Sequence, residues 1–225
     1  MSWAPAQRPD VSIRPVATPT LPVEFRGIAF YFLTLKPGER VSFASYYRLP
    51  EPRVLRTDMA VTGKGRFRGE KCFEVERHTY DEAGKLTARS LFYLALTERE
   101  VRWLLRIRRN PGEDVNAVEP TATFPRHLAT GLKWGHRTVG PIVDVVINGN
   151  SFRCLEIESV TPLDPHLNRL YIDLAGRQVY NHRYLRTDAP KPFAIPADAE
   201  TLSHGNMRYA SYYEDFPDFA LRPRA

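Results

Sequence analysis

Residues 71–80 read KCFEVERHTY, and residues 153–160 read RCLEIESV. In both stretches apolar and polar side chains alternate, which is the pattern of a β-strand with one buried face. The run Cys72-Phe73-Glu74-Val75-Glu76 returns as Cys154-Leu155-Glu156-Ile157-Glu158. We therefore predict two related strands, one in each half of the chain.

Nine segments share this short, aromatic or β-branched character and are bounded by turn residues, whereas no window keeps a helical period for three turns. The dipeptide Asn148-Gly149 is the strongest hairpin signal among the turns. The composition agrees, with 19 prolines, 11 tyrosines and 12 phenylalanines. The predicted strands are residues 40–49, 55–61, 71–80, 86–97, 101–109, 140–147, 152–160, 169–174 and 179–186.

Two further stretches recur in the same order as the strand above. YFLTLKPGERV (residues 31–41) aligns with FPRHLATGLKW (residues 124–134), and FYLAL (residues 92–96) aligns with LYIDL (residues 170–174). Ordered self-similarity indicates an internal repeat, and many antiparallel strands must close or stack to protect their edges. We predict an all-β fold: an internally duplicated antiparallel barrel or deep half-barrel of about nine to eleven strands.

The proline distribution divides the chain into three parts. Residues 1–24 form a Pro-rich N-terminal arm, and residues 25–186 form the duplicated domain, with halves of about 25–122 and 123–186. Residues 187–225 form a Pro-rich connection and a C-terminal strand.

The repeated phrases resemble those of an uncharacterised bacterial all-β family in which each half opens with FPL-x-x-G-x-x-W. Here that phrase is Phe124-Pro125 through Leu128, Gly131 and Trp134. The resemblance spans about residues 28–186 and implies a duplicated β fold but no particular activity. The family is often found in exported proteins, and this chain departs from it in having no export signal.

Residues 205–214 alternate strongly enough to form a strand beyond the second repeat. This strand can join the two halves within the chain, or it can cross to a second copy and make a homodimer. We favour closure within the chain, because pairing inside one molecule has no association cost. Tyr209 and Tyr213 share a face under strict alternation and are expected to point inward.

Charge and cysteine content narrow the classes of partner. The net charge is +6, but the positive residues are scattered and form no stripe for nucleic acid. Cys72 and Cys154 are too few for a disulfide framework or a Cys-rich zinc site, so we expect reduced, buried thiols. No apolar run approaches the roughly 18 residues of a membrane span, and the N-terminus lacks the apolar core of a signal peptide. A cytoplasmic location is expected.

Strand alternation also assigns the polar residues to faces. It places Glu74 and Glu156 on equivalent faces, and it separates Arg102 and Arg106 from Trp103. These charges can form a solvated face with weak cross-strand ion pairs, or they can line a pocket in which their pKa values shift.

In the pocket reading, the chain is a cofactor-independent enzyme of lyase, isomerase or decarboxylase type. The alternative is a non-catalytic module that binds a hydrophobic ligand or is associated with the cell envelope. The histidines lack the spacing of a metal site, so no metal or cofactor is expected. His182 is the best general-base candidate, since imidazole titrates near neutral pH. An excess of tyrosines and arginines suits a small aromatic or amphipathic, anionic ligand. The candidate catalytic residues are His182, Glu156 and Glu74, and the candidate ligand-binding residues are Arg102, Arg106, Trp103, Tyr180 and Tyr184.

Overall fold

A computed structural model of the chain describes residues 7–17, 25–26, 31–49, 51–120, 122–160, 165–188, 195, 197 and 199–222. In these residues the protein is all-β, with one short helix, α1 (Asp218–Leu221). All nine predicted strands are present. In the first half they are β3 (Arg40–Tyr47), β4 (Arg53–Phe67), β5 (Glu70–Tyr80), β6 (Leu86–Leu96) and β7 (Glu100–Arg108), and in the second half β12 (Arg137–Ile147), β13 (Asn150–Val160), β14 (His166–Asp173) and β15 (Gln178–Arg186).

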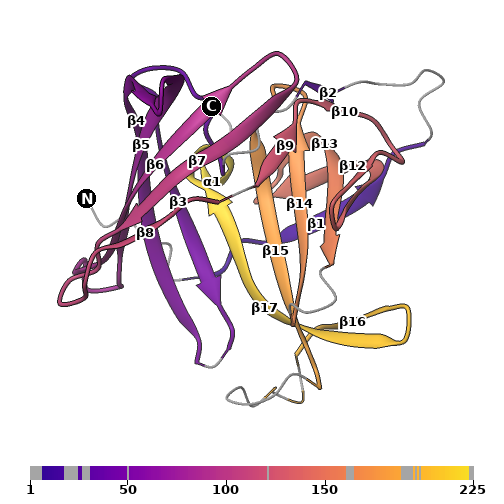
Figure 1. Ribbon diagram of the computed structural model, residues 1–225. Coiled ribbons are helices and arrows are strands. Elements are labelled where there is room, and N and C mark those ends of the chain that lie inside the picture. The colour runs from indigo at the N-terminus through magenta and orange to yellow at the C-terminus, as the bar shows by residue number, and fades with distance from the viewer. Residues whose placement is uncertain are drawn as a thin grey trace.

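One antiparallel sheet contains both halves. Its order is β1-β12-β13-β14-β15-β17-β3-β4-β5-β6-β7-β8. The C-terminal strand β17 (Met207–Pro217) pairs with β15 on one side and β3 on the other, so it joins the two halves within the chain (Figure 1). The remaining strands are β1 (Val11–Pro15), β8 (Asn116–Val118), β9 (Thr123–Pro125), β11 (Lys133–Trp134) and β16 (Thr201–His204), while β2 (Phe25–Arg26) and β10 (His127–Leu128) pair separately.

The sheet is open. In the part of the chain that is described, β1 and β8 are its two ends and no pairing connects them. A closed barrel is therefore not confirmed, whereas the antiparallel all-β class is. Strand β1 belongs to the segment expected to be a Pro-rich arm, and it pairs along β12 from Val11 opposite Ile147 to Pro15 opposite Val143.

Strand pairing has matching register in the two halves. Glu74 on β5 lies opposite Tyr93 on β6, and Glu156 on β13 lies opposite Tyr171 on β14. A bulge follows Tyr93 in the β6–β7 pair, and another follows Tyr171 in the β14–β15 pair. The strands aligned by sequence thus make corresponding pairings.

The loops aligned by sequence also dock in the same way. The Gly38 N–H donates to the Val61 carbonyl (3.0 Å), and the Gly131 N–H donates to the Val139 carbonyl (2.9 Å). The φ angles of the two glycines are 81° and 88°, in a region that residues with a Cβ seldom adopt. This backbone conformation explains why each aligned phrase carries a glycine.

The hydrophobic core lies between the two halves, against one face of the sheet that we call the inner face. The opposite face, called the outer face, is covered in the second half by a smaller apolar cluster that includes α1, whereas in the first half it carries half-exposed polar residues. The main core contains Val41, Phe43, Met59, Val61, Val75, Phe92 and Leu94 from the first half, and Val139, Ile142, Leu155, Ile157 and Ile172 from the second.

Two bulges overturn face assignments based on strict alternation. A shift in the β6–β7 register places both Trp103 and Arg106 against the ring of Phe92, at 5.9 and 5.8 Å, so they share the inner face. A shift in the β15–β17 register, where Arg183 opposes Tyr213 but Tyr184 opposes Ser211, puts Tyr209 and Tyr213 on opposite faces. An extra residue inverts the alternation beyond it.

Both cysteines are free and buried, as expected. No helix among the described residues has the length and apolar character needed to cross a membrane.

Candidate functional site

Two consecutive acidic residues lie at the centre of the sheet. Glu214 and Asp215 on β17 are 0% and 3% exposed. Successive strand residues point to opposite faces, so Glu214 lies on the outer face and Asp215 on the inner face. A buried carboxylate is costly unless charges or hydrogen bonds compensate it, so the partners of each one define a candidate site.

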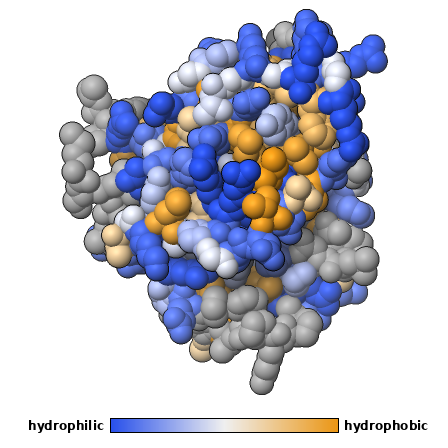
Figure 2. Space-filling view, turned by 60° about the vertical axis from the view of Figure 1, so that its left-hand side comes forward, coloured by the Kyte–Doolittle hydropathy of each residue, from blue (hydrophilic) through white to orange (hydrophobic). Residues whose placement is uncertain are grey.

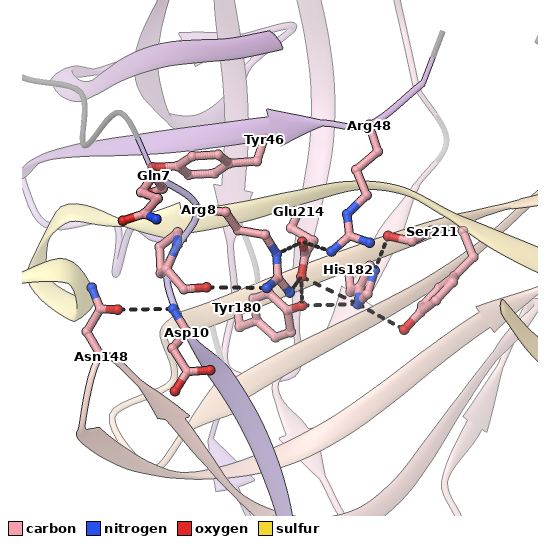
Figure 3. Close-up of polar contacts among 12 residues, drawn as sticks. Gln7, Arg8, Asp10, Tyr46, Arg48, Asn148, Tyr180, His182, Ser211 and Glu214 are labelled. Atoms are coloured by element: carbon pink, nitrogen blue, oxygen red, sulfur yellow. Dashed lines mark hydrogen bonds and ion pairs between the residues drawn. The ribbon is translucent and has the colours of Figure 1, made fainter. Parts of the chain in front are cut away.

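The partners of Glu214 come from distant parts of the chain (Figure 3). Arg8 of the N-terminal arm donates from Nε and Nη2 to the two carboxylate oxygens, at 2.5 and 2.7 Å. Tyr180 on β15 donates its hydroxyl to Oε1, and the Arg48 guanidinium lies 3.7 Å from Oε2. These contacts lower the pKa of Glu214 although burial opposes this, so the carboxylate stays ionised.

His182 lies beside this ion pair on the same face. Its Nδ1 is 3.0 Å from the Tyr180 hydroxyl and 2.9 Å from the Tyr184 hydroxyl, and its Nε2 is 2.9 Å from the Ser211 hydroxyl. The Tyr180 hydroxyl gives its single proton to Glu214, so Nδ1 carries the proton that it shares with Tyr180, and Nε2 accepts from Ser211. Burial lowers the pKa of His182 to about 4, so the imidazole is neutral at pH 7.

The contact of Ser211 with His182, and of His182 with Glu214, resembles a hydrolytic triad, in which a serine contacts a histidine that an acid orients. However, Ser211 and Glu214 are each 0% exposed, and a nucleophile must reach its substrate. A histidine with a pKa of about 4 is also a weak base at neutral pH. We interpret these residues as a buried network that fastens the arm, β15 and β17 together.

The partners of Asp215 lie on the inner face. Ser45 on β3 donates its hydroxyl to Oδ1, and Asn181 on β15 donates its amide to Oδ2 at 2.9 Å. Burial raises the pKa of Asp215, while Arg77 and Arg183 act in the opposite direction. Asp215 is thus bonded to one strand from each half.

Around Asp215 lies a set of half-buried side chains that we call the arginine–tyrosine cluster: Tyr31, Tyr47, Arg77, Arg183 and Tyr213. Tyr47 and Tyr213 stack with ring centroids 4.9 Å apart, and the Arg183 guanidinium lies 5.0 Å from the Tyr213 centroid. Arg77 Nη1 donates to the Tyr31 hydroxyl at 3.0 Å. The cluster thus combines cations with aromatic faces from both halves of the sheet.

Arg77 has a neutral hydrogen-bond partner. Several other arginines of the described residues pair with a carboxylate: for example, Arg89 on the neighbouring strand β6 lies 3.1 Å from Glu76. In contrast, no carboxylate of a described residue lies within 4.0 Å of the Arg77 guanidinium, which contacts a neutral phenol. The nearby Asp215 is already bonded to Ser45 and Asn181.

Tyr31 has an unusual backbone conformation, with φ at 50°. A bulky residue in the left-handed region costs roughly 1–2 kcal/mol, so its surroundings must hold it there. Such strain is often found at functional sites. Here the conformation accompanies a ring stacked on Phe43 and a hydroxyl bonded to Arg77.

The structure brings together some of the residues that the sequence singled out. His182, Tyr180 and Tyr184 form one network, as described above. Glu156 shares their face and accepts a hydrogen bond from the Tyr171 hydroxyl (2.9 Å), and the Tyr171 ring stacks on that of Tyr180 at 5.4 Å. These residues are largely buried, so they form a packed layer on the outer face of the second half.

The other predicted residues lie in the first half. Glu74 lies on the outer face of β5, beside Gly65, where a Cβ would meet its Oε1 at 2.7 Å. Arg102 pairs with Glu70 and Glu100. Trp103 and Arg106 pack on Phe92 on the inner face. None of these four contacts the His182 network in the interactions of the described chain.

The outer face of the first half carries charges that neutralise one another. Glu76 lies 3.1 Å from Arg89 and 4.0 Å from His78, and Arg56 pairs with Asp58. Figure 2 brings the side with β4 and β5 forward, and hydrophilic residues cover much of it around a hydrophobic area. This is the solvated arrangement of cross-strand ion pairs that was one of the two sequence interpretations.

Sequence reasoning missed the most buried charges, Glu214 and Asp215, and their partners Arg8 and Arg77. A usable signal was the pair Glu214-Asp215 inside the aromatic strand YYEDF, because two adjacent acids in a buried strand must each find a partner. No local pattern identifies Arg8, since its partner is 206 residues away.

Within the described part of the chain, no group of three His, Cys, Asp or Glu side chains is arranged to hold a metal ion. No family model, curated protein or solved structure matches this chain.

Proposed function

We propose that this protein binds a small aromatic, anionic molecule at the arginine–tyrosine cluster on the inner face of the sheet. The observation that carries the proposal is Arg77: a half-buried guanidinium whose hydrogen-bond partner is a phenol rather than a carboxylate. Removing a charge from water is costly without an opposite charge. Asp215 lies near Arg77 but is bonded to Ser45 and Asn181, so a ligand carboxylate would supply a directly bonded opposite charge through two parallel N–H···O bonds from the guanidinium.

The tyrosines favour an aromatic ligand. The rings of Tyr31, Tyr47 and Tyr213 stack on neighbouring rings and lie against Arg77, Arg53 and Arg183 respectively. A ligand ring can pack against their edges, at about 0.5–1.5 kcal/mol per pair. Burial raises the pKa of Tyr47 to about 12 and raises the pKa of Tyr213 well above its usual value, so these phenols are neutral near pH 7. A neutral aromatic surface beside a cation suits a ring that carries one acidic group.

We further infer that the chain arose by internal duplication and that the ligand lies at the junction of the two halves. The matching register of Glu74 with Tyr93 and of Glu156 with Tyr171 supports the duplication. The cluster draws Arg77 from the first half and Arg183 from the second.

A second candidate function is catalysis without a cofactor, of lyase, isomerase or decarboxylase type. The observation that favours it is Asp215, whose pKa is raised by burial and whose carboxylate interacts electrostatically with Arg77. A carboxyl group with a raised pKa can exchange a proton with a bound anion. Its 3% exposure and its two hydrogen bonds oppose this role, so we favour binding.

Isothermal titration calorimetry with benzoate tests the proposal, with benzamide as the uncharged analogue. We expect benzoate to bind the wild-type protein and benzamide to bind at least tenfold more weakly, because a charge-assisted contact contributes about 1.5–3 kcal/mol. Arg77→Gln should lose at least tenfold in benzoate affinity for the same reason.

Arg89→Gln is the matched control, since Arg89 lies on the neighbouring strand β6, pairs with Glu76, and is exposed. It should leave benzoate binding unchanged. Thermal melting of both variants shows that each is folded. Equal binding of benzoate by Arg77→Gln and wild type would refute the assignment, as would equal binding of benzoate and benzamide.

A further inference from the structure

We propose that Asp215 sets the charge selectivity of the site: its negative charge lowers the affinity for an aromatic dianion, such as a phosphonate, more than the affinity for a monoanion, such as a carboxylate or sulfonate. This inference rests on the proposed function, and it names both the ligand class and the residue that sets it.

Asp215 lies on the inner face of the sheet, as does the arginine–tyrosine cluster. Its carboxylate is near enough to interact electrostatically with Arg77, Arg183, Tyr47 and Tyr213. Its side chain is 3% exposed, so water screens this charge poorly. A ligand that binds Arg77 must therefore approach a fixed negative charge as well as a positive one.

The hydrogen bonds of Asp215 are those of an ionised carboxylate. The Asn181 amide donates to Oδ2, and the Ser45 hydroxyl donates to Oδ1, so both oxygens act as acceptors. An ionised carboxylate accepts at both oxygens, which agrees with this arrangement. The two donors come from β15 and β3, the strands on either side of β17, so the charge is held in place by the sheet itself.

The charge of the ligand determines how strongly Asp215 repels it. Repulsion from Asp215 acts once on a monoanion and twice on a dianion, because Coulomb energy is proportional to charge. In a partly screened site, repulsion from one nearby unit charge lowers affinity on the order of tenfold for each charge on the ligand. Attraction to Arg77 and Arg183 also doubles for a dianion, so Asp215 offsets part of that gain and lowers the affinity for a dianion about tenfold more than the affinity for a monoanion.

Benzenesulfonate and phenylphosphonate test this selectivity, because they have the same shape but carry one and two negative charges at about pH 8.5. Calorimetry gives the ratio of the two affinities in the wild-type protein. In Asp215→Asn the affinity ratio should shift about tenfold toward phenylphosphonate. The asparagine can keep both hydrogen bonds, since the Ser45 hydroxyl can rotate to accept.

Ser45→Ala is the control, because it removes a hydrogen bond to Asp215 but leaves the charge. It should melt at a lower temperature than wild type and keep the wild-type affinity ratio. An unchanged ratio in folded Asp215→Asn would overturn the inference and leave the proposed function standing. If Asp215→Asn does not fold, Asp215→Ser removes the same charge and should shift the ratio in the same direction; an unchanged ratio in folded Asp215→Ser overturns the inference. Failure of wild type to bind either molecule would overturn the proposed function as well.

Discussion

Protonation of His182 should destabilise the protein in acid by an amount that follows from its burial. Its pKa is about 4 in the folded state and 6.5 when unperturbed. Between these values the unfolded chain binds more protons than the folded one. The free energy of unfolding therefore falls as the pH decreases from about 6.5 to 4, and the contribution of neutral His182 is fully present above about pH 6.5. The full difference corresponds to about 3 kcal/mol, of which about 2 kcal/mol is lost by pH 5.

Urea unfolding at pH 7.5, 6 and 5 measures this loss. The wild-type free energy of unfolding should fall by about 2 kcal/mol between pH 7.5 and 5. His182→Gln should remove most of that fall, whatever its stability at pH 7.5. The pKa of Glu214 is lowered in the folded state, so its own contribution is lost only below about pH 4.5.

His136→Gln is the matched control, since His136 is exposed on the surface. It should keep the wild-type dependence on pH. If His182→Gln and His136→Gln lose stability equally between pH 7.5 and 5, His182 is not the buried neutral group described here.

Three further predictions concern the arm, the central strand and the thiols. Arg8→Ala should lower the free energy of unfolding in urea by about 1–3 kcal/mol, because buried Glu214 loses its bidentate partner, although more than a third of the Arg8 side chain is exposed. Arg14→Ala, on the exposed part of the arm, should change this free energy little. Equal effects of the two substitutions would show that Arg8 does not fasten the arm to Glu214. Deleting residues 205–225 removes β17 from between β15 and β3, so the monomer should melt at a lower temperature, whereas loss of only a dimer peak in size-exclusion chromatography would mean that this strand pairs between copies. Burial raises the pKa of both the Cys154 and Cys72 thiols, so a disulfide reagent should label them slowly until denaturant is added; rapid labelling of Cys154 in the native protein would be inconsistent with its burial.

The strands were predictable because their signals are local. Alternation in KCFEVERHTY and RCLEIESV identified β5 and β13, and Asn148-Gly149 identified the hairpin between β12 and β13, where both residues have positive φ. The pairing of β1 with β12 was not predicted, because prolines and short length hide a strand whose stability comes from its partner. An open sheet likewise cannot be told from a closed barrel by alternation, since both have the same period.

The candidate site was less predictable, for two physical reasons. Bulges at β7 and β17 inverted the alternation, so Trp103 moved to the face of Arg106, and Ser211 moved to the face of Glu214. The main charge pairs also join residues far apart in the chain, such as Arg8 and Glu214. His182, Tyr180 and Tyr184 were correctly placed together, because no bulge interrupts β15 between them.

A crystal structure of the protein with benzoate shows directly whether the arginine–tyrosine cluster holds the ligand. We expect the carboxylate to lie within hydrogen-bond distance of the Arg77 guanidinium, with the ring against Tyr31, Tyr47 or Tyr213. Benzoate bound at another place, with the arginine–tyrosine cluster empty at a concentration that saturates binding in solution, would contradict it.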